Sequence, residues 1–335
     1  MNVITWEDYV APEVLEAFTE RTGIAVNLES FEDSEELIGR LSAYSHRYDV
    51  VIFDNASAHR VANMKLLRRL DRNRIPGMAN LDQKFLNMDA DPGNNYTVPY
   101  LWGSTLVAYR KDKIVDPEPS FKLLFEPNPE LTGKVMMIDD PVEMFGVAHI
   151  YSGRSTNSYD KKSLAAAAET LKQQRRNLEV QYGSDKDVRD GLASGEVWAA
   201  MCYSGDAAWV AEDHEEVGYF FPKEGATLWL DIMAVARDSR NIDAAYKFIN
   251  FVLEPEIGAM NANHLWYATP NAKAMPLLSE ELLQDQALFP PKSVVKNSEF
   301  LRVTPEKVVT QIGRLLREVT TDNEVVGTAT PEPAE

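Results

Sequence analysis

The 335-residue sequence has few of the residues from which disulfides and metal centres are built. Cys202 is its single cysteine, and its five histidines show no ligand spacing, so we expect neither an intramolecular disulfide nor a zinc site. No run of about 18 apolar residues is present, which argues against a membrane-spanning helix. We therefore predict a globular protein without metal or cofactor.

Basic residues are also scarce relative to acidic ones. The sequence contains 34 Lys and Arg against 52 Asp and Glu, and its net charge is −18. This balance argues against nucleic acid and anionic membranes as partners, because both are bound mainly by Lys and Arg. A cationic partner fits the charge better, although solubility alone would also explain it.

The two ends of the sequence lead to two expectations. Residues 2–6 follow Met1 without the basic start, apolar stretch and cleavage site of a signal peptide, so we expect an export signal, if one exists, to have been removed. Residues 320–335 are rich in Thr, Glu, Pro and Gly and lack apolar periodicity, so we predict a disordered tail.

The first part of the sequence alternates between strand and helix patterns. Strands are predicted at 2–6, 24–29 and 48–53, with helices that begin near Pro12 and Ser34. Such a βαβαβ order forms a parallel sheet whose ligands bind beyond the carboxyl ends of the strands. Those ends are 6–8 and 54–55, and neither has the glycine-rich loop that would hold a dinucleotide.

A second α/β lobe is predicted from the later sequence. Its strands are expected at 134–138 and 197–203, with a helix at 163–173, and further strands are predicted at 217–222 and 228–235. No linker separates the lobes, so we expect the chain to cross between them more than once, with hinges near 101–105 and 228–231.

The sequence offers few candidate catalytic groups. The sequence has no Gly-x-Ser-x-Gly motif, and Cys202 lies inside a strand pattern, where a buried thiol is more common than a nucleophile. Asp140 with Asp139 or Glu143 could act as an acid and base pair, but Asp140 could equally cap a helix before Pro141.

Aromatic residues stand beside carboxylates where strands end. Taken singly, each pair is best explained as a core aromatic and a capping acid. Their recurrence instead predicts a ligand with cationic ends and an apolar middle, such as a linear polyamine. The groups are Trp6 with Asp8 and Tyr9, Tyr203 with Asp206, Trp229 with Asp231, and Trp266 with Tyr267.

From about Asn2 to about Arg317 the sequence resembles the periplasmic polyamine-binding proteins of putrescine and spermidine uptake systems. The resemblance rests on the order and spacing of segments 4–10, 18–26, 48–51, 98–103, 222–225, 229–231, 245–253 and 267–271. It implies the α/β fold of a type II periplasmic binding protein, in which two lobes are hinged about a cleft. The implied lobes are 1–103 plus 232–277, and 104–231 plus 278–319.

The resemblance also implies a function. The protein would be a monomeric periplasmic receptor, not an enzyme, that delivers a polyamine to the membrane permease of an ABC transporter. One alternative is a polyamine sensor that docks on a membrane signalling receptor, for example in biofilm regulation. A more distant alternative is an acid–base hydrolase.

The residues carried over from the family have two roles. Aromatic rings would wall the ligand, and carboxylates would receive its ammonium groups. The aromatic set is Trp6, Tyr9, Tyr203, Trp229 and Tyr267, and the acidic set is Asp8, Asp140, Glu143, Asp206 and Asp231.

The sequence also departs from the family pattern. Phe53 and Asp54 stand where relatives usually have Pro and Ser, Tyr203 replaces a more usual Trp, and Leu301 replaces a Gln. Asp54 adds a negative charge, so we expect spermidine or norspermidine to bind better than putrescine. Alternatively, Asp54 only caps the next helix.

Overall fold

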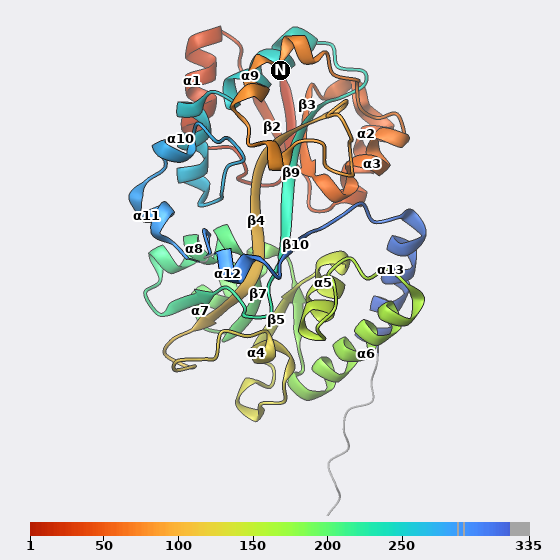
Figure 1. Ribbon diagram of the computed structural model, residues 1–335, viewed down its shortest axis with the longest axis vertical. Helices are drawn as coiled ribbons and strands as arrows, with labels where there is room; N and C mark the ends of the chain where they lie inside the picture. Colours follow the sequence, from red (N-terminus) through yellow and green to blue (C-terminus); the bar gives the residue numbers. More distant parts are fainter. Residues whose placement is uncertain (287, 291, 322–335) are drawn as a thin grey trace, which may run out of the picture. The chain divides into compact units, whose positions relative to one another are not determined.

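The computed structural model describes residues 1–286, 288–290 and 292–321, which form two compact units (Figure 1). The first unit consists of Met1–Ser104, Leu228–Lys292 and Phe300–Glu306. The second unit consists of Thr105–Thr227, Ser293–Glu299 and the segment that begins at Lys307. The chain thus passes between the units several times, and neither unit is a continuous stretch of sequence.

These bounds differ in places from the predicted lobes. Residues 228–231 were expected in the second lobe but belong to the first unit, because Asp231 pairs with Asp54 on one side and Leu101 on the other. Residues 278–292 and 300–306 also belong to the first unit. Of the predicted tail, Thr320 ends the last helix, and 322–335 lie outside the described residues.

The sheet of the first unit has the strand order β2-β1-β3-β9-β4. β1 runs parallel to β2 and β3, as the βαβαβ pattern predicts, while β9 is antiparallel to β3 and β4. The bounds are β1 Asn2–Thr5, β2 Asn27–Ser30, β3 Val50–Asp54, β4 Thr97–Arg110 and β9 Thr227–Val235.

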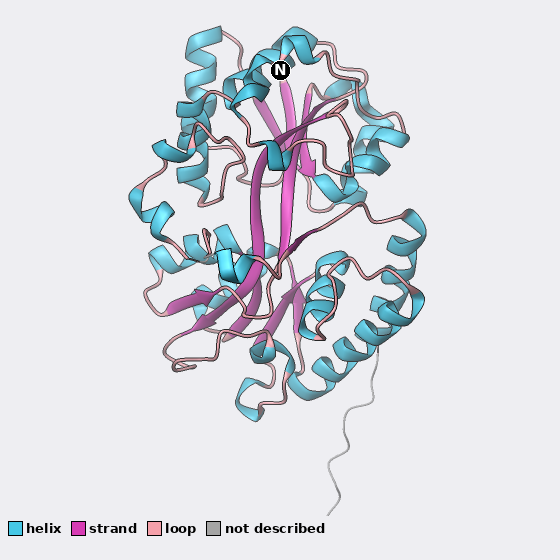
Figure 2. Cartoon of the chain, in the orientation of Figure 1, coloured by secondary structure: helices cyan, strands magenta, loops and turns pink. Residues whose placement is uncertain are grey.

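Helices surround these strands (Figure 2). The first helix begins with Pro12 and buries Val14 and Phe18, and its C-cap is Gly23, whose left-handed φ of 71° suits a glycine. The α-helices of the unit are α1 Pro12–Thr22, α2 Ser34–Tyr44, α3 Asn55–Asn63, α9 Ile242–Val252, α10 Pro255–Leu265 and α11 Glu280–Gln284. Short 3₁₀ helices are Ser45–Arg47, Arg72–Arg74, Pro76–Asn80, Gln83–Phe85 and Met275–Leu277.

The second unit has the strand order β4-β7-β5-β6, with β8 also paired to β4. β5 is parallel to β6 and β7, whereas β7 and β8 are antiparallel to β4. The strands are β5 Val135–Ile138, β6 Gln181–Gly183, β7 Ala199–Tyr203 and β8 Val217–Phe220. The helices are α4 Lys122–Phe125, Pro129–Leu131 (3₁₀), α5 Pro141–Tyr151, α6 Lys161–Leu178, α7 Asp185–Ser194 and α8 Ser204–Asp213.

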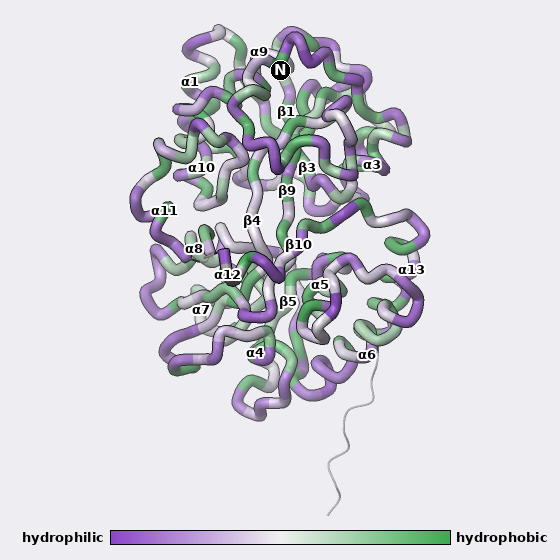
Figure 3. The backbone as a smooth tube through the Cα atoms, viewed as in Figure 1, coloured by the Kyte–Doolittle hydropathy of each residue, from purple (hydrophilic) through white to green (hydrophobic). Residues whose placement is uncertain are grey.

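The last three elements lie where the chain changes from one unit to the other, after Lys292, Glu299 and Glu306. They are α12 Lys292–Val295, β10 Glu299–Phe300 and α13 Glu306–Thr320. Hydrophilic and hydrophobic residues alternate along helices such as α6 and α13 (Figure 3), which is typical of helices with one buried face. No helix within the described residues is both long and apolar enough to cross a membrane.

Candidate functional site

The carboxyl group of Asp231 is the centre of the candidate site in the first unit. Asp231 lies on β9 and is only 6% exposed. The Tyr9 hydroxyl donates a hydrogen bond to its Oδ2 atom at 2.5 Å. Burial raises the pKa of Asp231 to about 7; the hydrogen bond from Tyr9 opposes this rise, and the negative charge of Asp54 adds to it.

Aromatic rings cluster around Tyr9, which donates the hydrogen bond to this carboxyl group. Tyr9 meets Tyr100 and Tyr267 edge-on, with ring centroids 5.7 Å and 5.8 Å apart. Trp229, two residues before Asp231, meets Tyr267 edge-on at 5.1 Å. The first unit therefore brings Tyr9, Trp229, Asp231 and Tyr267 together, although they come from three separate parts of the sequence.

A chain of buried hydrogen bonds holds Tyr9 in place. The Tyr100 hydroxyl donates to the Tyr9 carbonyl oxygen at 2.7 Å, and Asn261 Nδ2 donates to the Tyr100 hydroxyl at 2.8 Å. The amide of Ala11 donates to Asn261 Oδ1 at 2.9 Å. Burial raises the pKa of both Tyr9 and Tyr100, so their hydroxyls stay protonated as donors.

Tyr100 and Asn261 were not among the predicted site residues. Tyr100 lies in the segment 98–103, which supported the family resemblance, so the sequence carried a signal for it. Asn261 lies inside α10 and is 1% exposed. A buried asparagine in a helix could have drawn attention as a polar group that needs partners, but the sequence does not identify those partners.

Asp54 ends β3 and is paired with Asp231 in the register of β3 and β9. Its Oδ1 accepts a hydrogen bond from the amide of Ser57 at 2.7 Å, which caps α3, and its Oδ2 accepts one from the Ser34 hydroxyl at 2.7 Å. Asp54 thus caps α3, as the alternative interpretation from the sequence predicted. The same residue also places a negative charge opposite Asp231.

Trp6 and Asp8 follow β1 but differ from Tyr9 in their surroundings. The Trp6 ring packs on Phe31 with centroids 4.2 Å apart, at the edge of the core. Asp8 is exposed and has a left-handed φ of 51°. Asp8 therefore belongs to a turn on the surface of the first unit, and Trp6 and Asp8 remain predicted ligand contacts.

In the second unit, the predicted residues lie where α5 and α8 begin. Asp140 accepts hydrogen bonds from the amides of Val142 and Glu143, both at 2.9 Å, and so caps α5. Glu143 is 3% exposed and accepts a hydrogen bond from the Thr105 hydroxyl at 3.0 Å. The helix-capping alternative for Asp140 therefore matches its observed contacts.

Tyr203 and Asp206 stand at the end of β7 and in the first turn of α8. Asp206 is 6% exposed, and Arg189 donates to its Oδ1 at 2.7 Å. Since β5 and β7 are parallel neighbours, the helices that follow them begin at the same edge of the sheet. The four predicted residues of this unit, Asp140, Glu143, Tyr203 and Asp206, therefore share that edge.

Cys202 is buried, as predicted, and burial raises the pKa of its thiol well above the ordinary value. A neutral, enclosed thiol is a poor nucleophile. Across the described residues, no group of three or more His, Cys, Asp and Glu side chains is arranged to hold a metal ion.

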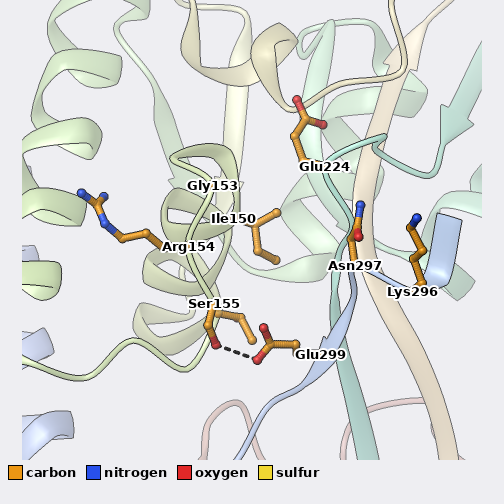
Figure 4. A pocket seen from close by; sticks show the side chains of 9 residues that line it. Ile150, Gly153, Arg154, Ser155, Glu224, Lys296, Asn297 and Glu299 are labelled. Atoms are coloured by element: carbon orange, nitrogen blue, oxygen red, sulfur yellow. Dashed lines mark hydrogen bonds between the residues drawn. The ribbon is translucent and has the colours of Figure 1, made fainter.

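The second unit also contains a polar pocket of about 350 Å³ (Figure 4). Its lining carries both signs of charge, from Arg154, Lys296, Glu224 and Glu299, and Ser155 donates a hydrogen bond to Glu299 at 2.6 Å. The predicted site residues do not line it. Mixed charge of this kind does not select a cationic ligand.

Comparison with known proteins identifies the family. Residues 13–291 match the family described as bacterial extracellular solute-binding protein. The chain belongs to this family. The prediction that this solute-binding protein is not an enzyme is thereby confirmed.

Individual relatives agree with this assignment. The chain is 32% identical to the spermidine/putrescine-binding periplasmic protein of Escherichia coli, over 88% of this chain and 84% of the relative. It is also 32% identical to the putrescine-binding periplasmic protein SpuD of Pseudomonas aeruginosa, over 88% of this chain and 85% of the relative.

A solved structure described as a putative spermidine/putrescine ABC transporter from Listeria monocytogenes superposes with a TM-score of 0.87 at 30% identity. The superposition covers 96% of this chain and 98% of the Listeria chain. The predicted α/β fold of a type II periplasmic binding protein is confirmed.

Proposed function

We propose that this solute-binding protein captures a linear polyamine outside the cytoplasm and delivers it to the membrane permease of an ABC transporter. The observation that carries the proposal is the buried Asp231 carboxyl, which accepts a hydrogen bond from Tyr9, beside the ring cluster of Tyr9, Tyr267 and Trp229. A carboxylate pairs with an ammonium group, and aromatic rings contact methylenes and attract the cation. The names of the relatives, which bind spermidine or putrescine, support the same ligand class.

Within the proposal, Asp231 and Trp229 are the main determinants of affinity in the first unit. Removing the carboxylate that holds a desolvated ammonium group costs about 2 to 5 kcal/mol of binding free energy. Asp8 and Trp6 of the first unit, and Asp140, Glu143, Tyr203 and Asp206 of the second, are proposed as further contacts. Asp206 already pairs with Arg189, so a ligand contact there would compete with an internal cation.

A calorimetric and thermal-shift panel of putrescine, cadaverine, spermidine, norspermidine and spermine tests the proposal. Ligand at about 100 times its dissociation constant adds about 2.7 kcal/mol to the unfolding free energy. Asp231→Asn should lose most of this gain. The matched control is Asp243→Asn, which removes a surface carboxylate that is 88% exposed, and it should respond like the wild type. A melting temperature that no amine changes would refute the proposal.

We further propose that a triamine binds better than a diamine. Asp54 and Asp231 place two carboxylates at one register pair of β3 and β9, and Asp54 adds to the rise in the pKa of Asp231. A ligand with more ammonium groups compensates more of this negative charge.

Calorimetry of wild type and Asp54→Ser with spermidine, norspermidine and putrescine tests the preference. The variant should lose triamine affinity and keep its diamine affinity. Equal triamine affinity in the two proteins would mean that Asp54 acts only through its contacts with Ser57 and Ser34.

A further inference from the structure

The position of Asp231 has a consequence for how a cation would bind. Resting on the proposed function, we propose that binding at Asp231 is coupled to proton release: the ligand's ammonium group displaces a proton that the carboxyl group holds in the ligand-free protein. The ammonium keeps its own protons, and the displaced proton passes to the solvent. No covalent bond other than the O–H bond of the carboxyl is broken.

The groups packed around Asp231 favour a neutral carboxyl when no ligand is present. Tyr9 reaches it from the segment after β1, and Tyr100 on β4 and Tyr267 after α10 pack on Tyr9. Asp54 lies opposite on β3 and carries a charge of the same sign. In the described part of the chain, no Lys or Arg forms an ion pair with Asp231, so its negative charge has no basic partner.

The contribution of each neighbour has a known direction. Burial, the largest cause, and the negative charge of Asp54 both raise the pKa of Asp231, only the Tyr9 hydroxyl lowers it, and together they give a pKa of about 7. The carboxyl of the ligand-free protein is therefore about half protonated at pH 7. An ammonium group at hydrogen-bonding distance favours the charged carboxylate and so lowers its pKa. Binding near neutral pH then requires the proton to leave.

Tyr9 lowers the pH at which this exchange takes place. Its hydroxyl stabilises the carboxylate, so Tyr9→Phe removes the one neighbour that lowers the pKa of Asp231. The ring packing and the hydrogen bond from Tyr100 to the Tyr9 carbonyl oxygen do not depend on the hydroxyl. Tyr9→Phe should therefore move the proton exchange to higher pH without removing the carboxyl group that binds the ligand.

The test is calorimetry of the full chain with spermidine at pH 6, 7 and 7.5, in pairs of buffers with different ionisation enthalpies. The dependence of the heat on the buffer gives the number of protons released. We expect about 0.9 at pH 6 and about 0.5 at pH 7, because these are the protonated fractions of a group whose pKa is about 7. Affinity should fall by up to about tenfold per pH unit below pH 7.

Two variants make the result specific. Tyr9→Phe should release more protons at pH 7.5 than the wild type, and Asp243→Asn should match the wild type at each pH. Tight spermidine binding with equal heats in both buffers at pH 6 would overturn the proton coupling and leave the proposed function intact. Absence of binding to every amine at all three pH values would overturn both.

Discussion

Asp231→Asn should make the ligand-free protein more stable above neutral pH while it weakens polyamine binding. The carboxyl is buried without a basic partner among the described residues, so ionising it disfavours the folded state. Asparagine at the same position has a similar size and no charge. The substitution should thus separate the role of Asp231 in binding from its effect on folding.

The size of the effect follows from the pKa of Asp231. The folded state raises it from 3.8 to about 7. When the pKa of a group is higher in the folded than in the unfolded state, the group stabilises the fold below its unfolded-state pKa. This stability is lost as the pH rises through its folded-state pKa. About three pKa units correspond to about 4 kcal/mol in total. Between pH 5 and pH 7.5 the wild type should lose about 2 to 3 kcal/mol through this group, and the variant none.

Urea unfolding at pH 5, 6, 7 and 7.5 measures the difference. The quantity of interest is the unfolding free energy of Asp231→Asn minus that of the wild type, because other titrating groups cancel. This difference should increase with pH, and circular dichroism at pH 7.5 checks that both proteins are folded. The control Asp243→Asn, at an exposed position, should show a difference that does not change with pH.

A difference that stays constant from pH 5 to pH 7.5 would refute the reasoning. It would mean that Asp231 titrates at the same pH in the folded and unfolded chains, and the proton coupling would then lose its basis. A difference that decreases with pH would show that the carboxylate form is favoured in the folded protein.

Two further predictions concern buried groups of each unit. Tyr100→Phe leaves the Tyr9 carbonyl oxygen and Asn261 Nδ2 without the hydroxyl that both contact. Urea unfolding should therefore show a loss of about 1 to 3 kcal/mol in unfolding free energy. An unfolding free energy unchanged within error would mean that water replaces the hydroxyl. Cys202 should react with iodoacetamide only after denaturation, because burial raises the pKa of its thiol. Rapid labelling of the native protein at pH 8 would contradict its enclosed position.

The sequence predicted much of the fold because strands and helices alternate with clear periodicity. It also located Tyr9, Trp229 and Tyr267 as site candidates, since they stand beside acids or turns at the ends of elements. It did not predict that Tyr9 donates to Asp231, because the two are 222 positions apart. Which partners such residues find depends on strand order, which the local pattern does not encode.

The assignment of residues 228–231 shows the same limit. Their strand pattern is clear, but the unit to which they belong is decided by pairing with β3 and β4. Asn261 is a second example: its role depends on Tyr100, which lies 161 positions earlier. In both cases the local sequence predicts the strand or helix, whereas the contacts that give the residue its role come from distant parts of the sequence.

The hydrogen-bonded path from Asp231 through Tyr9 and Tyr100 to Asn261 also bears on the synthesis of the protein. It joins residues near the start of the chain to residues that the ribosome adds about 220 to 250 positions later. A nascent chain that has not reached Asn261 cannot complete the path, however much of its β1 to β3 region has formed. The site is therefore assembled only after most of the chain has been made.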